Sequence, residues 1–146
     1  MYMDAQNRPS LAQSVAAAAS TIVSTDSIDL LSALDNPGRS SVDLRAIAVM
    51  TTALVGAGAS IQAQLISSAS SNLGSPTVLA SGPVTTVANA GIGTVLLDVP
   101  MPDVAQRYIG FQYVISGATT TAGAVTAGFV GGSDRGSRFI PMNLGL

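Results

Sequence analysis

The chain contains 146 residues, of which 47% are hydrophobic and 10% are charged, and its formal net charge is −2. Every acidic residue is Asp, every basic residue is Arg, and the sequence has no Lys, Glu, His, Cys or Trp. This composition excludes a disulfide framework and a transition-metal site built from His or Cys, and it argues against the clustered basic residues that bind nucleic acid. We therefore expect one domain that folds without a cofactor.

The low charge and a mean hydropathy of +0.47 are compatible with a membrane protein or with a soluble subunit that neighbouring molecules cover. The longest uncharged tract, residues 46–97, is interrupted throughout by Gln, Asn, Ser, Thr, Pro and Gly. A membrane-spanning helix needs about 20 predominantly apolar residues, and the tract holds no such run. The sequence therefore predicts no membrane partner and a surface that contacts other protein subunits.

The N-terminal region, residues 1–12, has no periodic hydrophobic pattern, which is typical of an extended arm. The following segment, LAQSVAAAASTIVS, is rich in Ala but also contains Ser, Thr and Val, so it favours a strand over a short helix. Residues 25–43 contain the turn sequence Asn36-Pro37-Gly38 and predict a loop or a short strand. Residues 13–146 are then predicted to form a single domain that ends in a Gly-rich tail, residues 131–146.

Clear strand patterns begin with DLRAIAVMTTAL, residues 43–54. Its two faces are both apolar, with Ala46, Ala48 and Met50 on one and Ile47 and Val49 on the other, so we expect both faces to be covered. The segment SIQAQLISSAS, residues 60–70, alternates more strictly, with its aliphatic side chains at 61, 63 and 65 inward and its two Gln outward.

The rest of the chain continues as short strands separated by turns. PTVLAS predicts a short strand, and SGPVTTVANAGIG predicts a loop with room for one more. TVLLDVP, residues 94–100, alternates so that Val95, Leu97 and Val99 oppose Thr94, Leu96 and Asp98. The Gly-x-Gly sequences at 56–58 and 91–93 are interpreted as hairpin turns, since neither completes a dinucleotide-binding fingerprint.

The stretch RYIGFQYVISGATTTAGAVTAGFV, residues 107–130, predicts two strands joined as a central hairpin by a Thr-rich turn. Its first strand carries the best apolar stripe in the chain, formed by Ile109, Phe111, Tyr113 and Ile115. Together these patterns predict an all-β jelly roll or β-sandwich of about eight short antiparallel strands with an extended N-terminal arm.

Residues able to perform chemistry are scarce. A nucleophilic triad needs a base such as His or Lys, and neither is present. The carboxylates closest in sequence, Asp26 with Asp29 and Asp98 with Asp103, could serve a glycosidase, and we interpret them as Asx turns and strand ends. A calcium site built from Asp and backbone carbonyls would need only oxygen ligands, but the sequence has no Asp-x-Asp-x-Asp loop. We expect the protein not to be an enzyme.

Several segments resemble one family of known proteins. SPTVLASGP, the Arg-Tyr before IGFQYVISG, TTTAGAVTAGFV, the opening MDAQ and the stretch DSIDL look like the jelly-roll capsid cement proteins of tailed bacteriophages, of the Bordetella short-tailed phage type. The resemblance covers the chain from Asp4 to about Val130. It implies a non-enzymatic protein on the outer surface of the virion head, without cofactors, that bridges neighbouring major capsid proteins, commonly as a homodimer, with a trimer also open.

We expect the arm, through Tyr2, Met3 and Arg8, and the tail to contact the capsid or the sister subunit. The tail residues expected to make these contacts are Arg135, Arg138 and Phe139. The planar guanidinium of each arginine can bind a carboxylate through two bonds. Three other functions stay open. They are a tail-associated or receptor-binding β module that recognises host glycan, a major coat subunit with a jelly roll, and a β-sandwich hydrolase that uses Asp pairs.

Overall fold

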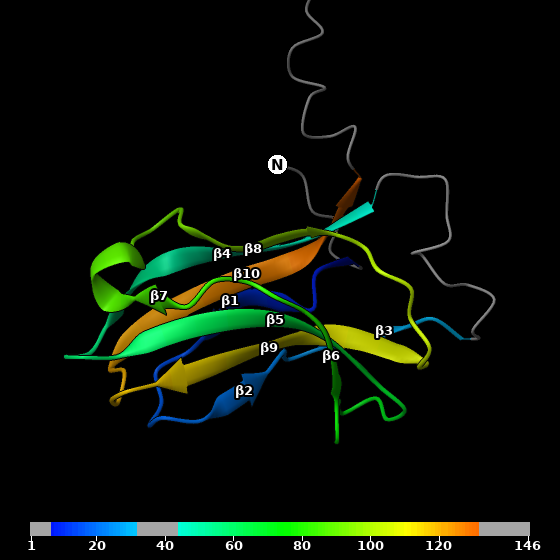
Figure 1. Cartoon of the computed structure of the whole chain (residues 1–146), viewed down its shortest axis with the longest axis horizontal. Coiled ribbons are helices and arrows are strands. Elements are labelled where there is room, and N and C mark those ends of the chain that lie inside the picture. The colour runs from blue at the N-terminus through cyan, green and yellow to red at the C-terminus, as the bar shows by residue number, and fades with distance from the viewer. Residues whose placement is uncertain (1–6, 32–43, 132–146) are drawn as a thin grey trace, which may run out of the picture.

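The protein is a two-layer β-sandwich, seen in a computed structural model that describes residues 7–31 and 44–131 (Figure 1). The strands are β1 (Ser10–Ser14), β2 (Thr21–Val23), β3 (Ile28–Asp29), β4 (Leu44–Val55), β5 (Ser60–Ser68), β6 (Thr77–Ser81), β7 (Thr85–Thr86), β8 (Val95–Pro100), β9 (Tyr108–Ser116) and β10 (Ala122–Gly131), with a 3-10 turn at Val87–Asn89. The expectation of an all-β sandwich is confirmed.

The strand order is that of a jelly roll. Sheet A has the order β1-β10-β4-β8, and sheet B has the order β2-β9-β5-β6, with β3 beside β9 and β7 beside β5. The antiparallel pairs are nested, because β1 pairs with β10, β2 with β9, β4 with β8 and β5 with β6. A long hairpin that is folded over on itself into two sheets gives this nesting, which defines the eight-stranded jelly roll.

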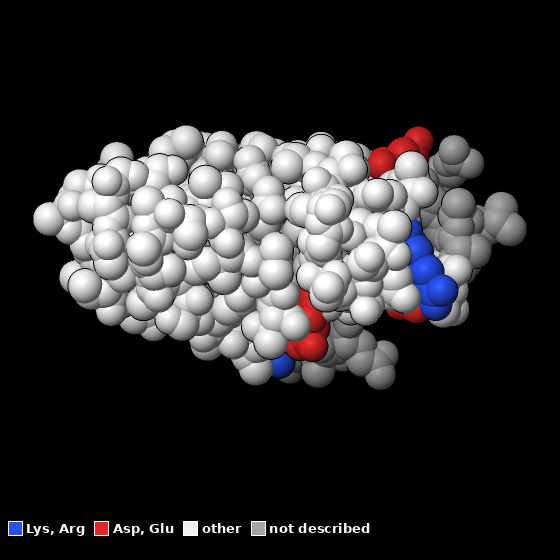
Figure 2. Space-filling model, turned by 90° about the horizontal axis from the view of Figure 1, so that it is seen from below, with Lys and Arg blue, Asp and Glu red and all other residues white. Residues whose placement is uncertain are grey.

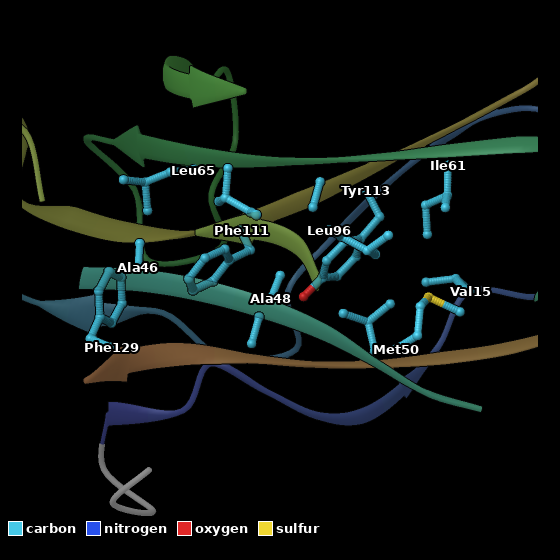
Figure 3. Close-up of a cluster of buried hydrophobic side chains, with 14 of the residues drawn as sticks. Val15, Ala46, Ala48, Met50, Ile61, Leu65, Leu96, Phe111, Tyr113 and Phe129 are labelled. Atoms are coloured by element: carbon cyan, nitrogen blue, oxygen red, sulfur yellow. The ribbon is translucent and has the colours of Figure 1, made fainter. Parts of the chain in front are cut away.

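The core lies between the two sheets and is filled by the residues that strict alternation predicts (Figure 3). All four members of the β9 stripe are buried, and so are the inward aliphatic residues of β5. Phe111 of sheet B meets Phe129 of sheet A with ring centroids 5.3 Å apart. Burying an apolar side chain of this size stabilises the fold by about 1.5–3 kcal/mol, so this stripe is central to stability.

The expected hairpin at residues 107–130 is wrong. β9 lies in sheet B and β10 in sheet A, so residues 117–121 cross between the layers instead of joining two paired strands. The Gly-x-Gly turn at 56–58 also crosses, from β4 to β5, and the one at 91–93 joins strands that do not pair with each other. The two crossing turns pack together closely, because a Cβ on Gly117, which has φ +85°, would clash with the carbonyl oxygen of Gly58.

The expected alternation of residues 94–100 is also wrong at its start. Val95 is 51% exposed, whereas Leu96 and Leu97 are both buried. The pairing of β4 with β8 shifts register between Ala48 and Val49, and such a bulge turns two successive residues toward one side. β4 matches its prediction only over its first half, where Ile47 is buried on the face opposite Ala46 and Ala48, while Thr51 and Thr52 are exposed.

The segment from 11 to 24 contains two strands, as favoured, and no helix. β1 begins at Ser10, so the predicted arm of residues 1–12 overlaps this strand, and only its first part can precede the sandwich. Ser10 is buried, and its hydroxyl accepts a hydrogen bond of 2.8 Å from the hydroxyl of Tyr113 in the core. The predicted turn at Asn36-Pro37-Gly38 and all of the tail after Gly131 lie outside the described residues.

Candidate functional site

Charged side chains gather at one end of the sandwich. Among the described residues the charged ones are Arg8, Asp26, Asp29, Arg45, Asp98, Asp103 and Arg107. In Figure 2 the charges lie in the half of the surface toward that end, and the opposite half is uncharged. We call the end that holds Arg45, Arg107 and the pair Leu44–Gly131 the charged end. The opposite end, formed by residues 56–59, 84–95 and 117–121, is the charge-free end.

The nested pairing also brings the chain connections to the charged end (Figure 1). β1 and β10 are antiparallel, so the start of the first strand lies at the same end as the finish of the last. Gly131 is the register partner of Leu44, and Leu30 donates a backbone hydrogen bond of 2.8 Å to the carbonyl oxygen of Arg107. All the points at which the described chain begins, breaks off or resumes therefore lie at the charged end.

The predicted contact residues can be placed only in part. Tyr2, Met3, Arg135, Arg138 and Phe139 lie outside the described residues. Arg8 is described, and it is partly exposed just before β1. What the topology does fix is that the arm and the tail are attached at one end of the body.

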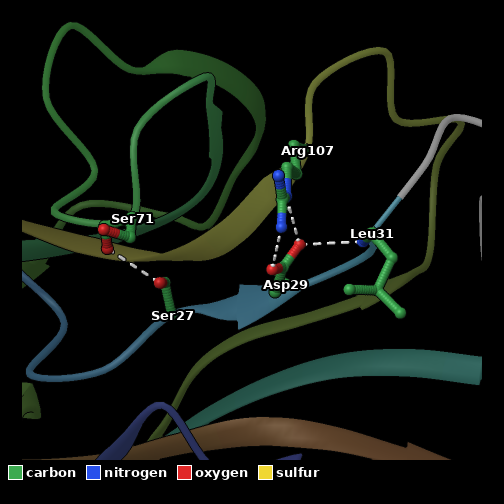
Figure 4. Close-up of polar contacts among 5 residues, drawn as sticks. All are labelled: Ser27, Asp29, Leu31, Ser71 and Arg107. Atoms are coloured by element: carbon green, nitrogen blue, oxygen red, sulfur yellow. Dashed lines mark hydrogen bonds and ion pairs between the residues drawn. The ribbon is translucent and has the colours of Figure 1, made fainter.

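The best-defined polar group at the charged end is an ion pair between β3 and the residue that precedes β9 (Figure 4). The Nε and Nη2 atoms of Arg107 donate to the two carboxylate oxygens of Asp29, each at 2.7 Å. Asp29 also accepts a hydrogen bond of 2.8 Å from the backbone of Leu31, which closes an Asx turn. The guanidinium lies 5.2 Å from the ring centre of Tyr108, so the arginine is held by its carboxylate partner and by a neighbouring aromatic face.

The electrostatics of this pair bear on the Asp-pair hydrolase. The hydrogen bonds from Arg107 lower the pKa of Asp29, and the bonds from Asp29 raise the pKa of Arg107. A glycosidase needs one carboxyl whose pKa is raised so that it can donate a proton. Asp29 is therefore unsuited to that role, and the interpretation of this residue as an Asx turn at a strand end is confirmed.

A second ion pair joins β4 to β8. Arg45 donates from Nε to Asp98 at 2.8 Å and from Nη2 to the Asp98 backbone oxygen at 3.2 Å. Both side chains are mostly buried, with exposed fractions of 20% and 27%. No group of three or more acidic residues that could hold a metal ion occurs within residues 7–31 and 44–131. The charged end therefore carries two ion pairs that each connect segments far apart in the sequence.

Sequence reasoning missed the charge-free end as a surface. Several large aliphatic residues are exposed there, namely Val55, Val84, Ile92 and Val95. Two features of the sequence could have indicated this surface, namely the uncharged tract of residues 46–97 and the aliphatic Ile92 between two glycines. The Gly-x-Gly sequence around Ile92 was interpreted only as a turn.

A protein-family model described as Bbp16 matches residues 10–129, which is most of the chain. The chain belongs to the Bbp16 family. The family name points to a Bordetella phage protein, and the match runs from the first residue of β1 almost to the end of β10. A search of curated proteins found no match to the chain. Within residues 7–31 and 44–131 there is no helix with the length and apolar character of a membrane span.

Proposed function

We propose that this Bbp16-family protein is a non-enzymatic capsid cement protein that binds the outer surface of the assembled phage head and bridges neighbouring major capsid proteins. The strongest support for this proposal is that the two ion pairs and the attachment points of the arm and the tail all lie at the charged end. A rigid jelly-roll body presents two ion pairs there, and both the arm and the tail are attached beside them. A body with two chain segments attached at one end can contact a curved protein surface at more than one point.

The mechanism follows from linkage. A protein that binds the expanded, assembled shell and not its dissociated subunits stabilises the shell by its binding free energy. Many equivalent sites on one head would add modest individual contacts into a large resistance against the pressure of packaged DNA. Virion location, on the outer surface of the head, is part of the same proposal.

The direct test is co-sedimentation of the purified protein with expanded heads from the same phage. Saturation at a fixed ratio to the major capsid protein supports the proposal. A protein that leaves heads bare and binds phage tails or host cells instead would be a receptor-binding module, and self-assembly into shells would indicate a coat subunit.

A truncation locates the contact. Removing residues 2–6 spares Pro9 and Ser10, which are buried, so the body should stay folded. We expect this truncation to weaken head binding while the thermal unfolding midpoint is retained. A second variant, Arg8→Gln in the full chain, removes one predicted contact of the arm and should weaken head binding to a smaller extent. Full occupancy of heads by the truncated chain would contradict the role of the arm.

A further inference from the structure

A row of glutamine amides crosses the outer face of sheet B, where β5 and β9 lie side by side (Figure 1). The register of these strands places Gln64 opposite Gln112, and both point away from the core. Gln112 donates from Nε2 to Oε1 of Gln64 at 2.6 Å, and Gln64 donates from Nε2 to Oε1 of Gln62 at 3.4 Å. Gln62 donates in turn to the carbonyl oxygen of Gly82 at 2.8 Å. We call these three glutamine side chains the amide row.

The direction of the amide row is fixed at its Gly82 end. A backbone carbonyl only accepts hydrogen bonds, so the side-chain nitrogen of Gln62 must face it and the side-chain oxygen of Gln62 must face Gln64. The same reasoning applies to each amide along the row, and it turns the nitrogen of Gln112 toward Gln64. The row therefore ends in the side-chain oxygen of Gln112, which is an acceptor.

This terminal acceptor is buried and has no donor in the protein. Gln112 is only 8% exposed, and within the described residues no group donates to its Oε1. Buried polar atoms of this kind are nearly always paired, either with protein groups or with a bound molecule. Hydrogen bonds in a row also polarise one another, which makes the last oxygen a stronger acceptor. The amide row thus requires a hydrogen-bond donor from outside the chain.

The surroundings of the amide row carry no charge. β2, β5, β6, β9 and the loop of residues 69–76 contain only uncharged residues. This loop lies on the same outer face, because a Cβ on Gly110 would be 2.6 Å from the side chain of Leu73. Gly110 is the outward residue of β9 that comes before Gln112, so the loop borders the amide row on one side. A molecule that binds beside the loop meets amides, hydroxyls and aliphatic groups only.

These features restrict the chemistry of the ligand. A charged ligand would lose hydration and find no opposite charge. An extended peptide is disfavoured, because its N–H and C=O groups pair with the edge of a sheet and not with its face. A sugar carries several neighbouring hydroxyls, each of which can donate and accept. One hydroxyl can donate to Gln112, and another can accept from the exposed hydroxyl of Ser81, which itself accepts from Gln64 at 3.1 Å.

We propose that the amide row, ending in Gln112, is a binding site for a neutral saccharide. The inference goes beyond the cement role and does not depend on it, because it rests only on the outer face of sheet B. On a head that carries many copies of the protein, individually weak saccharide contacts would act together.

The test uses the full chain and a glycan array that contains neutral and anionic glycans, followed by NMR titration with the neutral oligosaccharide that binds best. We expect neutral glycans to bind equally well at low and high salt, since the face has no charge for salt to screen. We also expect the side-chain amide signals of Gln112 and Gln64 to shift saturably. This measurement on the wild type decides the question even if a variant fails to fold.

A variant pair assigns the binding to the amide row. Gln112→Met keeps the length of the side chain and removes the terminal acceptor, so the dissociation constant should rise about tenfold, as expected for the loss of one good hydrogen bond. The matched control is Thr51→Val, which removes an exposed hydroxyl from β4 in the other sheet and should leave the constant unchanged. Circular dichroism of both variants checks that the fold is retained.

Four results would overturn the inference. They are no binding of neutral glycans at millimolar concentration, binding of anionic glycans alone, saturable shifts that leave the amide row unchanged, and unchanged affinity in a folded Gln112→Met variant. Co-sedimentation with heads separates this inference from the proposed function. A chain that binds saccharide but leaves heads bare would refute cementing alone, whereas a chain that saturates heads but binds no saccharide would refute the saccharide site alone.

Discussion

The hydrogen bond between Tyr113 and Ser10 joins sheet B to the first strand of sheet A inside the core, and its two partners are not equivalent. The Tyr113 hydroxyl donates to Ser10 at 2.8 Å, and the Ser10 hydroxyl donates in turn to the side-chain oxygen of Gln13 at 2.7 Å. Both hydroxyl-bearing residues have no exposed surface. Gln13 has a second donor, because it also accepts from the backbone of Thr25 at 3.0 Å.

We predict that Ser10→Ala destabilises the protein more than Tyr113→Phe. Ser10→Ala leaves the Tyr113 hydroxyl buried without this acceptor, which should cost about 1–3 kcal/mol. Tyr113→Phe removes the donor and keeps the ring, so it should cost only about 1 kcal/mol. The double variant should cost less than the sum of the two, since it removes both partners together.

Urea unfolding followed by far-ultraviolet circular dichroism measures these differences, which is suitable because the chain has no Trp. A cost for Tyr113→Phe equal to or above that for Ser10→Ala would refute the reasoning. It would show that the hydroxyl of Ser10 is not the required acceptor.

The same tyrosine gives the protein a dependence on alkaline pH. Burial raises the pKa of Tyr113, and the hydrogen bond to Ser10 opposes that rise only in part. An unfolded tyrosine ionises near pH 10, as is usual for this side chain. Below that pH the tyrosine is neutral in both states, so its contribution to the free energy of unfolding is fully present. Above it the unfolded state releases a proton that the folded state keeps, so stability falls by at most about 1.4 kcal/mol per pH unit. Tyr113→Phe should flatten this decline in stability with pH. The sequence has no Lys whose titration in the same pH range would add to it.

Three further variants test the core, the contact between the sheets and the charged end. Phe111→Ala should lower the free energy of unfolding by about 3–5 kcal/mol, and a near-neutral result in urea would show that the inward face of β9 is wrongly assigned. Gly82→Ala should be strongly destabilising, because its Cβ would clash with the carbonyl oxygen of Leu96 in the other sheet, whereas Gly91→Ala, which meets open space, is the control for thermal unfolding. Arg107→Gln should raise the pKa of Asp29 toward the ordinary range in a carboxyl NMR titration, and an unchanged pKa would mean that the ion pair does not form in solution.

The parts of the fold that alternation controls could be predicted from the sequence. β5 and the stripe of β9 have strict period-two patterns, and their inward residues are buried as expected. The bulge that turns both Leu96 and Leu97 inward could not be predicted in this way, since it depends on register with β4.

The pairing of the strands was predicted less well, for a physical reason. A short turn between two strands usually makes a hairpin, but in a jelly roll equally short turns cross between the sheets, and only the core partners decide which occurs. The site shows the same limit. Asp29 and Arg107 are 78 residues apart, and nothing in one sequence relates them. The uncharged tract of residues 46–97 was visible, but the sequence did not show that parts of it meet residues 117–121 at one end.

The position of β10 has a consequence for how the chain can fold during synthesis. The final strand lies between β1 and β4, in the interior of sheet A. Until the ribosome has delivered residues 122–131, β1 lacks the strand that it pairs with, and the β1–β10 contacts have the longest sequence separation among the strand pairs of the described residues. Such contacts form late and slowly. A chain that terminates before β10 therefore lacks an interior strand of sheet A, so only chains synthesised through residue 131 can complete the sandwich.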